Sequence, residues 1–449
     1  MRGQRAAIYA FDHVPFVTVN RGMDSSWLHP RDELVRTMQR IYRLRMTTTS
    51  GGNLSIRDAD GSIWITPSRV DKGRLQASDI VCVHADGTRT GLHPPSSEFP
   101  FHRQIYASRP DIGAIVHAHP GALVAFSICR LLPDTRVQTH AHEVCGKVAY
   151  APYACPGSEA LGTNIARVFA DGADCVMLEN HGVVIGGRDL REAFQRFETL
   201  EFVAQTLVRA SALGRVETLD GDTLRDQPMP EFAPMQAVAP GNTEKAARMQ
   251  LCKFVHRAYE QRLLISTAGA LSARLEGQEF LVTPRRRDRL ELESPGIVRA
   301  RRGFCEAGKQ PSRAALLHAL IYERHPAVGA VINAQPAHAS AFCMTKAALS
   351  TRTIPESYLV LRDAPKMPFA CIVRDAEEIA ACVSLEETPV VLIENEGALI
   401  VGKDVLEAFD RLEVLEATAE ALLLGRPLGP LVPMPNEALT ELRRAFGLE

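Results

Sequence analysis

Two histidines one residue apart, at the end of an apolar segment, are the clearest chemical signal in the sequence. His117 and His119 follow residues 113–116, a run of small and β-branched residues that favours a buried strand. Side chains at positions i and i+2 leave a strand on the same face, so both imidazoles can point toward one atom. Imidazole nitrogen is a preferred ligand of zinc, and the sequence therefore predicts a metal site at this strand end.

Two further residues complete the candidate site. His181 lies between two β-prone runs, and Glu98 lies just before a segment with helical character. Three histidines with an open fourth position are typical of a catalytic zinc site, in which a carboxylate serves as the base or as a displaceable ligand. The alternative is that these histidines only pack in the core or lie at the surface.

The second half of the chain repeats the first and helps to separate these alternatives. Residues 266–274 resemble residues 49–57, and the offset between matching positions stays between 215 and 217. The apolar positions are kept, whereas the chemical ones change together. In the order His117, His119, His181 and Glu98, the second copy has Asn333, Gln335, Glu396 and Ala314. Their joint loss favours metal chemistry that is retained in the first copy alone.

The periodicity of apolar residues predicts the elements that must hold this site. We expect helices over 30–44, 99–108, 161–169 and 189–212, and strands over 54–57, 62–66, 81–84, 114–117, 175–178 and 183–185. A segment rich in Pro, Asp and Gly then separates the copies. The predicted division is an N-terminal extension (1–23), a catalytic domain (24–215), a linker (216–243), a degenerate domain (244–435) and a C-terminal tail (436–449).

The composition excludes several classes of function. The chain has 449 residues, 46% hydrophobic and 23% charged, and a formal net charge of -2, so no broad positive field favours nucleic acid or an anionic membrane. No apolar segment is long enough to span a bilayer, and the N-terminal residues lack the apolar region of a signal peptide. Ten cysteines without a Cys-X-X-Cys pair indicate reduced thiols, and we expect a cytoplasmic protein.

Several motifs together resemble those of the class II aldolase/adducin family, which includes fuculose-phosphate aldolase and ribulose-phosphate 4-epimerase. The matching segments, in chain order, are 50–55, 65–68, 95–98, 117–120, 151–153 and 180–182. The resemblance covers the whole first domain, and the second domain resembles the same fold in degenerate form. It implies two tandem three-layer α/β/α domains, each around a mixed, mostly antiparallel sheet.

The resemblance also implies roles for individual residues. His117, His119 and His181 would bind a divalent metal, most often Zn²⁺, with Mn²⁺, Co²⁺ or Fe²⁺ as alternatives. Glu98 would approach the metal in the absence of substrate and act as general acid/base in its presence. The implied phosphate-pocket residues are Asn53, Thr66, Ser68, Ser96 and Ser97.

The sequence departs from the family pattern at two points. Arg69 stands where the phosphate loop of the aldolases usually has glycine, and its guanidinium can meet a phosphate or carboxylate or remain a solvated surface group. The tyrosine that a neighbouring subunit supplies as proton donor in fuculose-phosphate aldolase is absent. His140 or His142 is the candidate replacement, because imidazole titrates near neutral pH.

The predicted function is that of a metal-dependent, aldolase-type carbon–carbon lyase. Its substrate would be a small, sugar-phosphate-like hydroxy-carbonyl compound that reacts through a metal-stabilised enediolate. An epimerase, decarboxylase or dehydratase could use the same site, and a non-catalytic interaction protein like adducin is the alternative of another class. Family members form fourfold rings, so a dimer of this duplicated chain is expected to imitate such a ring, with the second copy in a structural role.

Overall fold

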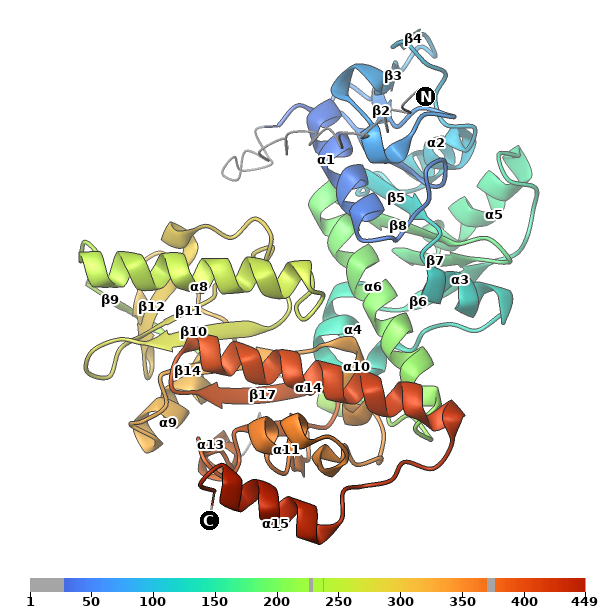
Figure 1. Ribbon diagram of the computed structural model, residues 1–449. Helices are drawn as coiled ribbons and strands as arrows, with labels where there is room; N and C mark the ends of the chain where they lie inside the picture. The colour runs from blue at the N-terminus through green and yellow to red at the C-terminus, as the bar shows by residue number, and fades with distance from the viewer. Residues whose placement is uncertain (1–27, 226–228, 237, 370–375, 449) are drawn as a thin grey trace, which may run out of the picture.

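Each half of the chain is built around its own β-sheet (Figure 1). The structure is a computed structural model that describes residues 28–225, 229–236, 238–369 and 376–448. The N-terminal extension predicted over residues 1–23 lies outside the described residues.

Within the described residues, the first sheet has eight strands, and only β6 and β7 pair in parallel. Their spatial order is β4 (Arg89–Thr90), β3 (Val81–Val83), β2 (Ile63–Ile65), β1 (Asn53–Arg57), β5 (Ala114–Ala118), β8 (Val183–Gly187), β7 (Cys175–Leu178) and β6 (Val148–Ala151). The helices of this half are α1 (Pro30–Arg43), α2 (Phe99–Ser108), α3 (Gly121–Ile128), α4 (Thr139–Cys145), α5 (Glu159–Ala170) and α6 (Leu190–Ser211). The helices and strands predicted from periodicity are therefore present, with ends shifted by a few residues.

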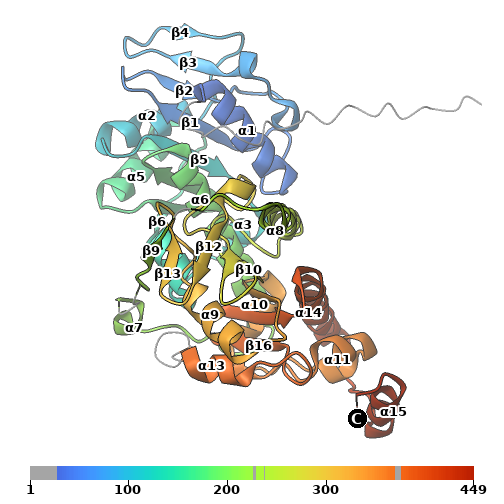
Figure 2. The ribbon, with the colours of Figure 1, turned by 90° about the vertical axis from the view of Figure 1, so that its left-hand side faces the viewer.

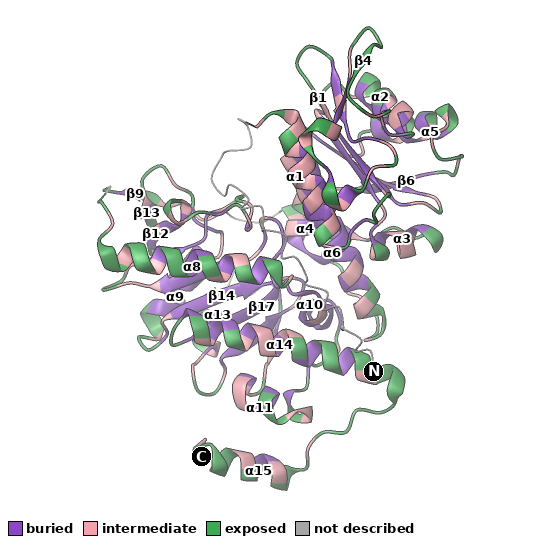
Figure 3. Ribbon diagram, turned by 45° about the horizontal axis from the view of Figure 1, so that its top comes forward, coloured by how far each residue is buried: buried purple, intermediate pink, exposed green. Residues whose placement is uncertain are grey.

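The first half has three layers, because apolar side chains point to both faces of its sheet and helices cover each face. In β5, Val116 faces the core formed with α1 and α6, whereas Ile115 faces a second core formed with α2 and α5. Figure 3 shows the buried strands between helices whose outer faces are exposed. Because successive side chains of a strand point to opposite faces, a strand that is apolar throughout needs a helical layer on both sides.

The second half repeats this plan. Its sheet, as far as the structure describes it, runs in the order β15 (Lys366–Met367), β16 (Val390–Ile393), β17 (Gly397–Gly402), β14 (Ala330–Ala334), β10 (Ala270–Arg274), β11 (Phe280–Val282), β12 (Val298–Arg301), β13 (Phe304–Glu306) and β9 (Ala233–Met235). The register is also repeated: Asn53 faces His117 across β1 and β5, and Ala270 faces Asn333 across β10 and β14. The predicted tandem α/β fold is confirmed.

The helices of the second half also form a layer on each side of the sheet. They are α8 (Asn242–Glu260), α9 (Ala315–Arg324), α10 (Ala337–Cys343), α11 (Pro355–Leu361), α13 (Ala376–Cys382) and α14 (Val405–Gly425). One core contains side chains of α8, α10 and α14, and the other contains side chains of α9 and α13. The predicted C-terminal tail carries α15 (Asn436–Ala445), which lies beside α11 at the far end of this half (Figure 2).

The segment predicted as a linker contributes to the second sheet. It carries the short helix α7 (Gly221–Arg225) and the strand β9, which pairs in parallel with β13 at the sheet edge. Pro234 sits within β9, and an edge strand tolerates proline because one side of its backbone needs no ladder bond. Periodicity could not reveal so short a strand.

The two halves are joined by a buried polar network under α6. Glu198 of α6, fully buried, accepts hydrogen bonds from the Tyr259 hydroxyl (2.8 Å), the Arg262 guanidinium (2.9 Å) and the backbone N–H of Ser266 (2.9 Å). Arg40 of α1 pairs with Asp288 of the second half at 2.8 Å. Because a buried carboxylate is stable only when fully paired, this network fixes the orientation of one half against the other.

No helix in the parts of the chain that the structure describes is both long and apolar enough to cross a membrane.

Candidate metal centre

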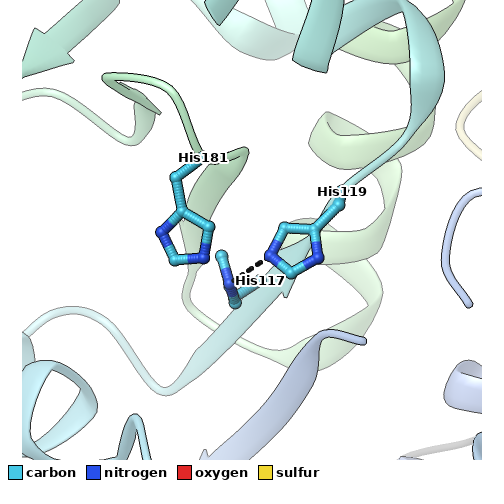
Figure 4. Close-up of side chains that lie close together, drawn as sticks. All are labelled: His117, His119 and His181. Atoms are coloured by element: carbon cyan, nitrogen blue, oxygen red, sulfur yellow. Dashed lines mark hydrogen bonds between the residues drawn. The ribbon is translucent and has the colours of Figure 1, made fainter. Parts of the chain in front are cut away.

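The three predicted histidines converge on one point (Figure 4). His117 is the fourth residue of β5, His119 follows the strand end, and His181 lies in the turn between β7 and β8. One nitrogen from each ring lies within 4.8 Å of the others, and the ring centroids are 4.7 to 5.0 Å apart. Strand pairing explains this, because β8 is the hydrogen-bonded neighbour of β5 and brings its preceding turn alongside the strand end.

The turn that carries His181 needs an unusual backbone. Asn180 has a φ of 54°, a left-handed conformation that asparagine adopts more readily than most residues. At Gly182, a Cβ atom would come within 2.6 Å of both the Ala118 carbonyl oxygen and a ring carbon of His119. Glycine therefore allows the turn to approach the other two histidines.

The protonation of the rings suits a metal. The Nδ1 atom of His117 lies 2.9 Å from the Val183 carbonyl oxygen, so Nδ1 carries the proton and Nε2 faces the cluster. Burial, together with the charge of His117, lowers the pKa of His119 to about 3 and that of His181 to about 4. Both are therefore neutral near pH 7, the form that binds metal ions.

Glu98 closes the cluster. Its carboxylate lies 3.1 Å from Nε2 of His117 and 3.5 Å from Nε2 of His181, and its Oε1 is buried without a hydrogen-bond partner. Burial alone would raise the pKa of Glu98, but the charge of His117 and the hydrogen bond from Asn53 outweigh it and lower the pKa. The same carboxylate raises the pKa of His117 against the effect of its burial. Three imidazoles and an unsatisfied carboxylate oxygen at one point fit a divalent cation.

Behind Glu98 runs a chain of buried hydrogen bonds that the sequence did not reveal. Asn53 donates to Glu98 Oε2 (2.8 Å) and accepts from His102 Nε2 (2.5 Å). Nδ1 of His102 in turn lies 2.7 Å from the Ser55 hydroxyl, which is also 2.7 Å from the Tyr106 hydroxyl. No motif of the sequence singles out His102, yet it is fully buried and orients the residue that holds Glu98. The available signal was the repeat, because His318, Ser272 and Tyr322 keep the same network in the second copy.

The predicted phosphate-pocket residues lie on three neighbouring segments. The loop after β2 and the segment before α2 are side by side, since the Ser96 N–H donates to the Thr66 carbonyl oxygen (3.2 Å). Thr66 is buried and its hydroxyl accepts a hydrogen bond from the Leu54 N–H, so this side chain stabilises the contact between β1 and the loop after β2. Ser68 is partly exposed and Arg69 and Ser97 are exposed.

The structure does not bring His140 and His142 to the three histidines. His142 lies 3.2 Å from the Thr135 hydroxyl within its own segment. His140 lines a cavity formed mainly by the second copy, where Arg313 and Asn333 are among its neighbours. Both lie away from the cluster of their own chain because α4 packs on α6, at the side of the first half that faces the second half. That one of them supplies a proton to the site of a neighbouring subunit, as the tyrosine of fuculose-phosphate aldolase does, stays a prediction.

The second copy has the same frame without the ligands. Asn333 accepts a hydrogen bond from His318 Nε2 at 2.6 Å, which replaces the role of Asn53 in the first copy. Glu396 forms an ion pair with Arg313 at 3.2 Å. Among the described residues, the histidine cluster of the first copy is the one group with the spacing of metal ligands.

Comparisons with known proteins find relatives that align with about one copy of this chain. The L-fuculose phosphate aldolase of Methanococcus maripaludis is 35% identical over 176 residues, which cover 38% of this chain and 93% of that protein. The 3-oxo-tetronate 4-phosphate decarboxylase of Pectobacterium atrosepticum is 34% identical over 188 residues, which cover 41% of this chain and 85% of that protein. The crystal structure of YgbL from Klebsiella pneumoniae is 31% identical, covers 46% of this chain and 99% of that chain, and has a TM-score of 0.42. Each aligned segment has about the length of one copy.

The family model described as the class II aldolase and adducin N-terminal domain matches twice, over residues 32–208 and 249–423. The chain therefore belongs to the class II aldolase and adducin family, as a tandem pair of that domain.

Proposed function

We propose that the first copy is a metal-dependent carbon–carbon lyase that acts on a small hydroxy-carbonyl substrate. The observation that carries the proposal is the convergence of three imidazoles and one carboxylate at the end of β5. The relatives named above are an aldolase and a decarboxylase, and both activities break a carbon–carbon bond beside a carbonyl group.

His117, His119 and His181 would hold the cation, with Zn²⁺ as the best match to three nitrogen ligands and Mn²⁺, Co²⁺ or Fe²⁺ as alternatives. When bound, the cation supplies Lewis-acid chemistry by polarising the substrate oxygens.

Glu98 is the residue that moves the proton. Its carboxylate is unprotonated near pH 7, because its pKa is lowered, and its Oε1 has no hydrogen-bond partner. A carboxylate in this state accepts a proton from the substrate and can return it. Asn53 and His102 hold it in place by the hydrogen bonds described above, so that the acceptor atom faces the histidines.

The anionic end of the substrate would lie over the loops after β2 and before α2. Ser68, Ser97 and Arg69 offer hydroxyl and guanidinium donors at the exposed side of these loops, and Ser96 and Asn53 line their buried side. This arrangement suits a phosphate group, which binds charged and hydroxyl donors. The sugar-phosphate names of the relatives agree with it.

A substrate screen tests the proposal. Keto-sugar phosphates, unphosphorylated keto acids and aldehydes are supplied with and without Zn²⁺ or Mn²⁺, and aldehyde and CO₂ release are measured. Aldehyde release identifies an aldolase and CO₂ release a decarboxylase. Epimerised or dehydrated products without carbon–carbon cleavage would overturn the lyase assignment. Absence of turnover and of bound metal would favour a non-catalytic role like that of adducin.

We further propose that two chains assemble so that each first-copy site is completed by another chain. Within one chain, α4 of the first copy covers the cavity of the second copy. The same contact made by α11, the counterpart of α4, against the first copy of another chain would close a ring of four domains from two chains. Light scattering coupled to size exclusion tests this, and a strict monomer would contradict it.

We also propose a cytoplasmic location. The nine cysteines in the described part of the chain are all free thiols, which suits a reducing compartment.

A further inference from the structure

The second copy contains a cavity at the positions that correspond to the histidine cluster of the first copy. The cavity measures about 330 Å³, the size of a small metabolite, and lies between the second sheet and α4 of the first copy. Asn333, Gln335 and Glu396, which occupy the positions of the three metal-binding histidines, all line it. We propose that this cavity binds a small hydroxylated phosphate monoester without a metal, as a site separate from the lyase centre.

The charge of the cavity favours an anion. Its lining contains four arginines and two glutamates, a formal surplus of two positive charges. Arg313 pairs with Glu396 at 3.2 Å and Arg286 pairs with Glu143 at 2.7 Å. Arg285 shares Glu143 with Arg286, at 3.6 Å, and Arg289 donates to backbone carbonyls, so two carboxylates face four arginines. A phosphate dianion would match this surplus of positive charge.

Arg289 shows how this charge is built into the fold. Its side chain is almost fully buried, and its guanidinium donates hydrogen bonds to the backbone carbonyls of residues 267–269, 284 and 287. Burial lowers its pKa only to about 10, so it remains charged at neutral pH. A buried cation held by neutral carbonyls raises the electrostatic potential of the cavity that it adjoins.

Two buried polar atoms at the cavity have no partner. They are Nε2 of His140, from α4, and Oε1 of Gln335. Buried polar atoms in native proteins are nearly always satisfied, so an orphaned pair at one cavity indicates a missing ligand. The imidazole N–H can donate to a phosphate oxygen, and the amide oxygen can accept from a ligand hydroxyl, which is why we specify a hydroxylated phosphate ester.

The repeat supports the same conclusion. The positions of Ser68 and Ser97 are occupied by Arg285 and Arg313 in the second copy, whereas Ser96 is kept as Ser312. The loops that would take an anion in the first copy are therefore more basic in the second, at the same place where the metal ligands disappear. Burial and the nearby arginines lower the pKa of His140 to about 4, and an anion in the cavity would raise it.

Hydrogen exchange of the full chain localises binding and so separates this cavity from the first copy. The probes are inorganic phosphate and glycerol 3-phosphate, with glycerol as the uncharged control. We expect glycerol 3-phosphate to protect residues 284–290 and 310–317 and glycerol to leave them unchanged. Protection by inorganic phosphate alone would overturn the assignment of a hydroxylated ester, and no protection by either anion would overturn the site.

Substitutions then test the arginines. Arg313→Gln should raise the glycerol 3-phosphate concentration that half-protects these segments at least about tenfold. That is the loss of affinity expected for one charge-assisted contact. Arg302→Gln is the matched control, because Arg302 pairs with Glu323 in the same copy and does not line the cavity. If Arg313→Gln fails to fold, Arg286→Gln replaces it, because the Arg286 side chain is 69% exposed and its loss should weaken glycerol 3-phosphate binding without unfolding the chain. Unchanged protection in a folded arginine variant, or equal loss in the control, would refute the proposal.

Discussion

Asn53 connects the buried hydrogen-bond chain to the carboxylate of the site, and its removal has a calculable effect. In Asn53→Ala, Glu98 loses a hydrogen bond to its charged oxygen, which is worth roughly 1.5–3 kcal/mol. The His102 N–H is also left unsatisfied in a fully buried position, at roughly 1–3 kcal/mol. We therefore expect the metal-free first copy to lose about 3–5 kcal/mol of its free energy of unfolding.

The second copy shows how the loss can be compensated. Ala270 stands there in place of Asn53, and Asn333, at the position of His117, accepts the hydrogen bond from His318. Adding His117→Asn to Asn53→Ala should provide His102 with the same acceptor. The double variant should therefore be more stable than the sum of the two single effects predicts, by about 2 kcal/mol.

Guanidinium unfolding in the presence of EDTA, followed by tryptophan fluorescence, measures this coupling. Trp64 lies in β2, and the other tryptophan, Trp27, also precedes the second copy, so the second copy contributes no tryptophan emission. The control pair is Asn53→Ala with His93→Asn, because His93 pairs with Asp79 and not with Asn53 or its partners. Additive effects for Asn53 and His117, within about 0.5 kcal/mol, would refute the view that the two copies solve the same hydrogen-bonding problem in different ways.

Three further predictions concern the base, the pH dependence and the contact between the copies. Glu98→Gln should keep bound metal but lower kcat by roughly 10²–10⁴-fold, measured on whichever substrate the screen identifies; unchanged turnover would exclude Glu98 as the base. Burial lowers the pKa of His318 to about 4, so between about pH 6.5 and 4 this imidazole is protonated in the unfolded chain and unprotonated in the folded chain. The free energy of unfolding therefore keeps its full value above about pH 6.5 and falls by about 2 kcal/mol at pH 5. Urea unfolding at several pH values measures this fall, and the His318→Phe variant should show a flatter pH profile than the wild type. Glu198→Ala should cost about 3–5 kcal/mol in thermal or chemical unfolding, because it leaves Arg262 and Tyr259 without their buried acceptor; a loss below about 1 kcal/mol would show that the network is not what joins the halves.

The residues themselves predicted the alternating helices and strands and the histidine cluster, whereas the topology of the sheets came from the resemblance to a family. The spacing of His117 and His119 on a strand fixes their common face, and the duplication showed which residues change when the chemistry is lost. His102 was missed because its hydrogen-bond partners, Asn53 and Ser55, lie on β1, about 50 residues away, and no short-range pattern links them.

The placement of α4 was also beyond a reading of the sequence. The sequence offered His140 and His142 as proton donors, but which site α4 faces depends on packing between the two halves. The charge network of Glu198 and Arg40, which determines that packing, joins residues more than 60 positions apart. The role of β9 was hidden for a similar reason, since three residues carry too little periodicity to predict a strand.

The central claim is that metal chemistry belongs to the first copy alone, and metal analysis tests it most directly. Protein stripped with EDTA, reloaded with zinc and desalted should contain one zinc ion per chain, because the described residues hold one such cluster. His181→Ala should lose that zinc while its melting temperature remains that of the stripped wild type, and Asn333→Ala in the second copy should retain it. Two zinc ions per chain, or full zinc content in His181→Ala, would contradict the account.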